Sequence, residues 1–448
     1  ANLGGEYAKL GQFNKAEAML AEAISIFREV GGDRSLSVAS SLGNLGRIHM
    51  RQDEYDAAGP LLEESLDIRK EVLGNAHALT ANSTTSAVTH ATPKKAGAAA
   101  DKGVGLSLAL YIGTNTTTAS ILDGAQVTNV DDITMSATGS HTGDTKAEAG
   151  GQGGDGGVSL GGAIAIAVVE NVTQSDIGTG SDMTATGDVS ASATHHGVST
   201  ILADGTAIGG DTAIGAALGF GFVEDRARSR TKRNLTADSV SLAAAGDGAS
   251  TVTAKASSKG EKSGGTSDGQ QTKQTNFANS RSGKTNGSGQ SASTDSGSVS
   301  VSAALAVNAS DSIVRASVAD NSVITATDGS LSLQSSNNMD AKAIADGSAK
   351  TTSGGTAVGI AVSINVATMV NEALVGAGST ITADGLSLGA AMKTVDSNSK
   401  HNFESKATSG ASGGDIGIAG SLALSVVDTD TSAIFGRQQS AGGTATLN

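Results

Sequence analysis

The densest group of chemically active side chains is the basic cluster "RARSRTKR", which spans residues 226–233. Four of its cations are spaced two residues apart, namely Arg226, Arg228, Arg230 and Lys232. Because side chains two apart on a strand point to the same face, this spacing predicts one positively charged strand face. Such a face could dock an acidic surface, including one on a second copy of the chain. It could equally be a solvated outer face that protects a strand from edge pairing.

A second candidate is the glycine-rich stretch "GGQGGDGGV" at residues 150–158, in which Asp155 holds the acidic position. The stretch resembles the glycine-rich nonapeptide whose tandem copies bind calcium between consecutive turns. Gly157 stands where the nonapeptide has a large apolar residue, and no second copy follows. The resemblance implies Asp155 as a calcium candidate, whereas the composition alone predicts a flexible loop.

The 7 histidines are scattered, apart from the neighbours His195 and His196. No third ligand lies at a recognisable spacing, so we expect a solvated loop pair and predict no metal or other cofactor. The sequence has neither a phosphate-binding loop nor a nucleophile elbow. Asp238, Asp328 and Asp384 lie in predicted turns, and no recurrent row of carboxylates with Arg or Lys is visible. We therefore expect no enzymatic activity.

The composition narrows the classes of partner. Lys and Arg number 30 against 44 Asp and Glu, which gives a net charge of −14 and argues against nucleic acid and anionic membranes as partners. The chain has no cysteine, which excludes disulfides and thiolate metal sites. No run of about 18 apolar residues predicts a membrane helix. Aromatic residues make up 2%, so the core must consist of small and aliphatic side chains that fill thin, stacked layers.

The beginning of the chain has the apolar period of helices. "LGGEYAKLGQFNKAEAML" starts at Leu3 and "LGRIHMRQDEYDAAGPLL" at Leu45, an offset of 42 residues, and the small residues Ala16 and Ala58 fall where two helices would cross. Over residues 1–81 the pattern resembles the 42-residue tetratricopeptide repeat of kinesin light chains. The resemblance implies a groove for a peptide partner, or else a helical cap or spacer, because at least three repeats are usually needed for independent stability. Residues 82–102 are rich in Ser, Thr and Ala and predict a linker.

From Gly103 onward the apolar period is two. Six alternating segments predict strands: "VGLSLALYI" (104–112), "VSLGGAIAIAV" (158–168), "AIGAALGFGF" (213–222), "VSVSAALAV" (299–307), "VGIAVSINV" (358–366) and "IGIAGSLALSV" (416–426). One face of each carries large apolar residues, which we expect to be buried by neighbouring coils. The other, which we expect to point outward, carries Gly, Ala and Ser, including Ala163, Ala361 and Ser363. Small residues allow another sheet to approach closely. We therefore predict one flat sheet packed on both faces, with the small face against a second wall of the coil or a neighbouring molecule.

The phrase "ITADGLSLGA" (381–390) recurs as "LTADSVSLAA" (235–244), "ITATDGSLSLQS" (324–335) and "MTATGDVSASA" (183–193). Each copy has apolar residues two apart on both sides of a turn, which predicts a strand, a bend and another strand. The repeats are 56 to 60 residues long, so we expect two or more short rungs in each. The prediction is a mostly β chain, a six-unit parallel β-solenoid or β-helix over residues 103–448. A flexible insertion is expected at 255–298, and a short α-helical tetratricopeptide array precedes the solenoid.

The alternating strands and the "ITADGLSL" corners resemble the repetitive regions of bacterial surface proteins of the filamentous-haemagglutinin and autotransporter-adhesin type. The resemblance implies secretion to the cell surface and adhesion, with partners that are like copies, cell-surface proteins or glycans. The chain opens inside a helical repeat, so we expect its targeting information to lie elsewhere. Two alternatives remain: an interaction scaffold that uses the helical repeats with the β region as a spacer, and a carbohydrate-active β-helix enzyme.

Overall fold

The computed structural model of the chain describes residues 12–52, 54–73, 77–93, 102–128, 130–153, 157–209, 211–259, 299–351, 355–396, 398–412, 415–436 and 440–442. Three helices come first: α2 (Phe13–Gly31), α3 (Leu36–Arg51) and α4 (Tyr55–Leu73). Ala16 and Ala58 are both buried where the helices pack, as the 42-residue offset predicts. The Ser35 side chain caps α3 by accepting a hydrogen bond from the amide of Val38 at 3.4 Å.

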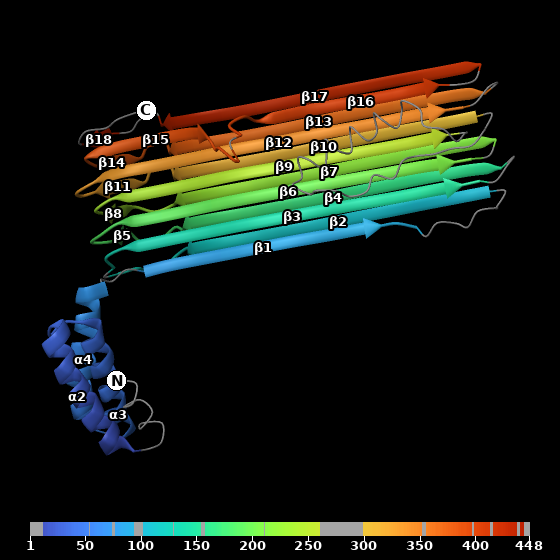
Figure 1. Cartoon of the computed structure of the whole chain (residues 1–448). Helices are drawn as coiled ribbons and strands as arrows, with labels where there is room; N and C mark the ends of the chain where they lie inside the picture. The colour runs from blue at the N-terminus through green and yellow to red at the C-terminus, as the bar shows by residue number, and fades with distance from the viewer. Residues whose placement is uncertain are drawn as a thin grey trace.

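The rest of the described chain is a stack of parallel strands in three sheets (Figure 1). Sheet A contains β1 (His77–Ala91), β3 (Ile133–Gln152), β6 (Val189–Ile208), β9 (Val240–Lys259), β12 (Ser330–Lys350), β15 (Gly385–Met392) and β16 (Asn402–Ser412). Sheet B contains β2 (Lys102–Ile121), β4 (Val158–Ile177), β7 (Thr212–Thr231), β10 (Val299–Val318), β13 (Thr356–Val375) and β17 (Ile416–Phe435). The corner sheet contains β5 (Met183–Thr184), β8 (Leu235–Ala237), β11 (Val323–Ala326), β14 (Thr380–Thr382) and β18 (Ser440–Gly442).

This arrangement is a parallel β-solenoid behind a helical start, and it confirms the predicted fold class. The six predicted strands all form and together make sheet B. Each pairs residue by residue with the next, so that Val158 of β4 lies beside Thr212 of β7 and Val299 of β10 lies beside Thr356 of β13.

The expected division of each repeat into several short rungs is wrong, because one repeat makes one coil. A coil consists of a strand in sheet B, a short corner strand and a strand in sheet A, as in β4, β5 and β6. β4 and β6 have 20 residues each, against about 5–6 in an average strand. Two such strands and a corner use up the whole repeat, so no residues are left for a second rung.

The repeated corner phrase builds an aliphatic core where the three sheets meet. In "ITADGLSL" the side chains of Ile381, Ala383, Leu386 and Leu388 point inward and are buried. The equivalent residues of the other copies join them in one hydrophobic cluster, together with Ile121, Ile177, Val318 and Val375 from the ends of sheet B strands. The phrase therefore recurs because each copy supplies one layer of this core.

Two predicted boundaries change. Residues 82–91 of the expected linker belong to β1, which pairs with β3 along its full length from His77 to Ala91. Residues 255–259 of the expected insertion belong to β9, and the remainder of that insertion lies outside the described residues.

Candidate interaction surface

The small residues of sheet B form the inner face of the coil. Ala163 and Ala361 are 1% and 0% exposed, and the buried Ser363 hydroxyl donates to the carbonyl of Ala343 in sheet A at 2.7 Å. The prediction that Ala163, Ala361 and Ser363 serve self-association is therefore wrong. Their face packs against sheet A of the same coil. This is the first of the two alternatives predicted for the small face, a second wall of the coil rather than a neighbouring molecule.

The two sheets touch through their backbones in this part of the coil. A Cβ added to Gly161 would lie 1.9 Å from the carbonyl oxygen of Thr206, and one added to Gly359 would lie 2.2 Å from that of Gly410. Around these glycines the coil is consequently too thin to enclose large side chains. The Val, Leu, Ile and Phe residues that alternate with the small residues here must point outward, because alternation leaves them no other face.

We call this outer surface the apolar face. It consists of five rows, each made of residues at the same register position on the six strands of sheet B. The rows are Val104, Leu160, Ile214, Val301, Val358 and Ile418; Leu106, Gly162, Ala216, Ala303, Ile360 and Gly420; Leu108, Ile164, Leu218, Leu305, Val362 and Leu422; Leu110, Ile166, Phe220, Val307, Ile364 and Leu424; Ile112, Val168, Phe222, Ala309, Val366 and Val426.

No side chain of these five rows is polar, and many are well exposed, up to 70% for Leu106. At about 4.8 Å between strands and about 6.7 Å between rows, the face covers about 1,000 Å². The largest apolar patch of an ordinary monomer is about 300–600 Å². The apolar face is therefore the strongest candidate for an interaction surface in the described residues.

The basic cluster lies beside the apolar face, on the outer side of β7. Asp176 of β4 accepts hydrogen bonds from Arg228 at 3.0 Å and from Arg230 at 2.8 Å. Arg226 contacts Glu224 on its own strand, and Lys232 follows the end of β7. The three arginines thus share one face as their spacing predicts, but carboxylates of sheet B already neutralise them. This pairing weakens the case for an acidic docking partner.

His195 and His196 lie on β6 rather than in a loop, so the expected solvated pair is wrong. His195 is buried: its Nε2 lies 3.1 Å from Asp225 Oδ1, and its Nδ1 lies 3.1 Å from Thr173 Oγ1. The network continues outward through amides, since Asn171 donates to Asp225 at 2.8 Å and Asn115 donates to Asn171 at 2.7 Å. It is a polar ladder between the two sheets, and its members come from β2, β4, β6 and β7.

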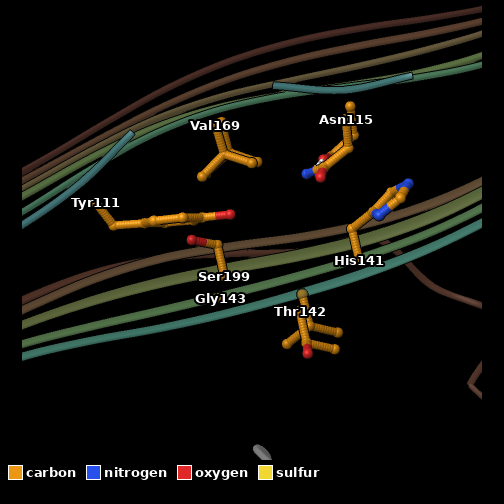
Figure 2. Close-up of a pocket in the computed structure, with 10 residues that line it drawn as sticks. Tyr111, Asn115, His141, Thr142, Gly143, Val169 and Ser199 are labelled. Carbon is orange, nitrogen blue, oxygen red and sulfur yellow. Dashed lines mark hydrogen bonds between the residues drawn. The ribbon is translucent and has the colours of Figure 1, made fainter. Parts of the chain in front are cut away.

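A small cavity adjoins this ladder (Figure 2). Tyr111, Asn115, His141 and Ser199 line it, and burial is the main cause that lowers the pKa of His141. Its volume of about 10 Å³ matches a single water molecule and is too small for an organic substrate. In the part of the chain that the structure describes, no group of three His, Cys, Asp or Glu side chains is arranged to hold a metal ion. Asp155, the calcium candidate, lies outside the described residues.

A row of charged residues crosses the outer face of sheet A, although no such row is visible in the sequence. Glu148, Asp204, Lys255 and Asp346 occupy one register position on β3, β6, β9 and β12. Burial raises the pKa of Asp204 and Asp346 and lowers that of Lys255. These residues are 51 to 91 positions apart in the chain, so only the register of the coils could have revealed the row.

A second cluster anchors the segment between β15 and β16 to sheet A. Asp247 of β9 contacts His196 of β6 and Lys393, and Asn338 of β12 donates to the carbonyls of Lys393 at 2.9 Å and Asn398 at 3.1 Å. The hydrogen bond to Asp247 raises the pKa of His196 despite partial burial. Burial raises the pKa of Asp247, but the hydrogen bonds from His196 and Lys393 outweigh it and leave that pKa lowered.

Replacing His196 with glutamine is expected to remove a pH-dependent part of the stability. Because the folded-state pKa of His196 lies above its ordinary value of 6.5, the His196–Asp247 contribution is complete below pH 6.5 and is lost as the pH rises through the folded-state pKa. We expect about 0.5–1 kcal/mol, since solvent screens this partly exposed pair. The measurement is urea unfolding at pH 5.5 to 8.5. The control Thr194→Gln, on the same outer face of β6, should follow the unaltered chain at every pH. An unchanged pH slope in His196→Gln would contradict the assignment.

The tetratricopeptide repeat family matches two overlapping segments of the chain, residues 1–71 and 37–87. These segments contain the three described helices, so the chain starts with tetratricopeptide-type repeats and continues as a parallel β-solenoid. No curated protein matches the chain. Among the described residues, no helix is long and apolar enough to cross a membrane.

Proposed function

We propose that this chain is a non-enzymatic structural and adhesive module of a large bacterial surface or fibre-forming protein. The observation that carries the proposal is the pair of long outer faces on one thin solenoid, one apolar and the other polar. A solenoid of this kind presents many shallow contacts along its length, which suits the binding of an extended surface. Its partners would be like copies, cell-surface proteins or glycans, and its place would be extracellular or on the bacterial cell surface.

We propose no catalytic role for the charged row on sheet A. Lys255 and Asp346 are each 6% exposed, so a polymeric substrate has no access to them. Raised pKa values in Asp204 and Asp346 are what a general acid requires, but their burial also accounts for these shifts without any function. Lys255 lies between the two carboxylates and offsets their charge. A structural role for the row is the simpler explanation.

Attachment of beads tests the adhesive proposal. Latex beads coated with the full chain are expected to attach to layers of bacterial cells in larger numbers than beads coated with serum albumin. Attachment should survive mild washing, because many weak contacts act together. Equal numbers of attached beads on both coatings would contradict an adhesive role.

The helical repeats support a second candidate, a scaffold in which they recruit a peptide while the solenoid acts as a spacer. A shallow hollow of about 400 Å³ lies at the start of α4, lined by Glu54, Tyr55, Asp56 and Ala57. Tyr55 is exposed there and could pack against a ligand. A chain cut before His77, where β1 begins, separates the two candidates. A scaffold would lose its partner, whereas an adhesive solenoid would keep its attachment to cells.

A further inference from the structure

The outer surface of sheet B has an apolar region with a defined border. The next row beyond the five apolar rows contains Thr114, Glu170, Glu224, Asp311, Thr368 and Asp428, of which four are carboxylates. On the inner side of the same strands the sheets meet through glycine, alanine and serine, which bury little apolar volume. Most of the large apolar side chains in this half of the coil therefore remain exposed to water unless another surface covers them.

We propose that the apolar face pairs with the apolar face of a second copy of this chain, related by a two-fold axis that runs along the stack of coils. With this axis each strand of sheet B lies opposite the same strand of the second copy, and the two strands run antiparallel. The proposal specifies the self-association that the proposed function includes, and in that respect it rests on the proposed function.

The rows of the apolar face are complementary to one another under this axis. The row that contains Gly162 is a groove, because Gly162, Ala216, Ala303 and Gly420 hold four of its six positions. The neighbouring row is a ridge made of Leu108, Ile164, Leu218, Leu305, Val362 and Leu422. An axis between these two rows places each groove against the partner's ridge, which is the self-complementarity that a two-fold interface requires.

The size and the charges of the surface also fit a second copy. The four rows that this axis pairs with one another cover about 770 Å² per copy. This is close to the roughly 800 Å² that each partner contributes to a standard interface. Under the proposed axis the row of Glu170, Glu224 and Asp311 lies at the border of the contact and stays in water. The axis parallel to the strands is less favourable, because it would place Glu224 opposite Asp311 and Arg228 opposite Arg315. An anionic bilayer is disfavoured by the same carboxylates and by the net charge of −14.

Sedimentation of the full chain tests the proposal. The unaltered chain is expected to be a dimer at micromolar concentration. Ile164→Lys should be a single chain with the same circular dichroism, since a charge on the ridge must be buried in the pair but stays in water in the single chain. Thr194→Lys, on the exposed outer face of sheet A, should remain a dimer. A single chain at all concentrations, a dimer that persists in Ile164→Lys, or flotation of the unaltered chain with anionic liposomes would each overturn the proposal.

Cross-linking tests the direction of the axis. Leu108→Cys introduces the sole cysteine of the chain on β2, at one end of sheet B. The proposed axis brings the two Leu108 positions to within about 12 Å, and a short bismaleimide should join them; the other axis places β2 opposite β17 and keeps them about 26 Å apart. Absence of the covalent dimer would overturn the geometry. Bead attachment that survives in Ile164→Lys would show that pairing and adhesion are separate, so failure of one can be told from failure of the other.

Discussion

Replacing Gly161 with valine is expected to prevent the first coils from closing and to reduce the free energy of unfolding by more than about 4 kcal/mol. The inner side of β4 touches the backbone of β6 at this position, and an added Cβ would lie 1.9 Å from the Thr206 carbonyl oxygen and 2.5 Å from its carbon. Both atoms belong to the backbone of a paired strand, so no side-chain rotation can relieve the clash. Thermal unfolding followed by circular dichroism measures the loss.

Gly162→Val is the matched control, because the next residue of the same strand points to the outer face. A Cβ there would meet the tip of the Leu106 side chain at 2.8 Å, and that side chain can rotate away. We expect a stability change within about 1 kcal/mol. The same variant fills the groove of the apolar face, so it should also weaken the proposed pairing. Equal destabilisation by both valines would contradict backbone contact between the sheets.

Arg233→Ala is the second change with a large expected effect, of about 3–5 kcal/mol. Arg233 is 3% exposed, and its guanidinium donates to four backbone carbonyls: Gly178 at 2.6 Å, Ala125 at 2.8 Å, Thr179 at 3.0 Å and Leu122 at 3.2 Å. These carbonyls follow β2 and β4, so the side chain ties the corners of three consecutive coils. Burial lowers the pKa of Arg233, but a guanidinium stays charged at neutral pH.

Two further variants at this corner distinguish the effect of the guanidinium's shape from that of its positive charge. Arg233→Lys keeps the charge but lacks the planar fork, so we expect it to recover less than half of the loss. Lys232→Ala removes a neighbouring cation outside this network and should change stability by about 0.5 kcal/mol or less. Urea unfolding midpoints measure all three variants. Equal midpoints for Arg233→Ala and Lys232→Ala would contradict the role of Arg233 as a clamp.

Alternation along the chain predicts the strands and their two faces, but it does not tell which face is inside. Leu106 and Ala163 exchange their expected places because the thickness of the coil is set by backbone contact and not by side-chain volume. A signal was present in the sequence: Gly105, Gly161, Gly215 and Gly359 hold the same position in four of the six alternating segments. Glycine at the same inward position of stacked strands indicates that another backbone approaches there.

The length of the strands and the clusters formed between coils could not be predicted from local sequence patterns. The polar segment "TNTTTAS" (114–120) lacks the apolar alternation of the segment before it, yet β2 continues through it to Ile121. The row from Glu148 to Asp346 and the ladder from Asn115 to His195 unite residues of different coils. Their spacing in sequence varies with each corner and insertion, so register had to be known first.

Cysteine labelling of the single chain tests most directly which face of sheet B is inside. The sequence contains no cysteine, so Ala163→Cys and Ile164→Cys each provide a unique thiol on opposite faces of β4. At a dilution where sedimentation shows the single chain, Ile164→Cys should react with a maleimide at nearly the rate of a free thiol, and Ala163→Cys should react far more slowly. Fast reaction at residue 163 with protection at residue 164 would contradict the account.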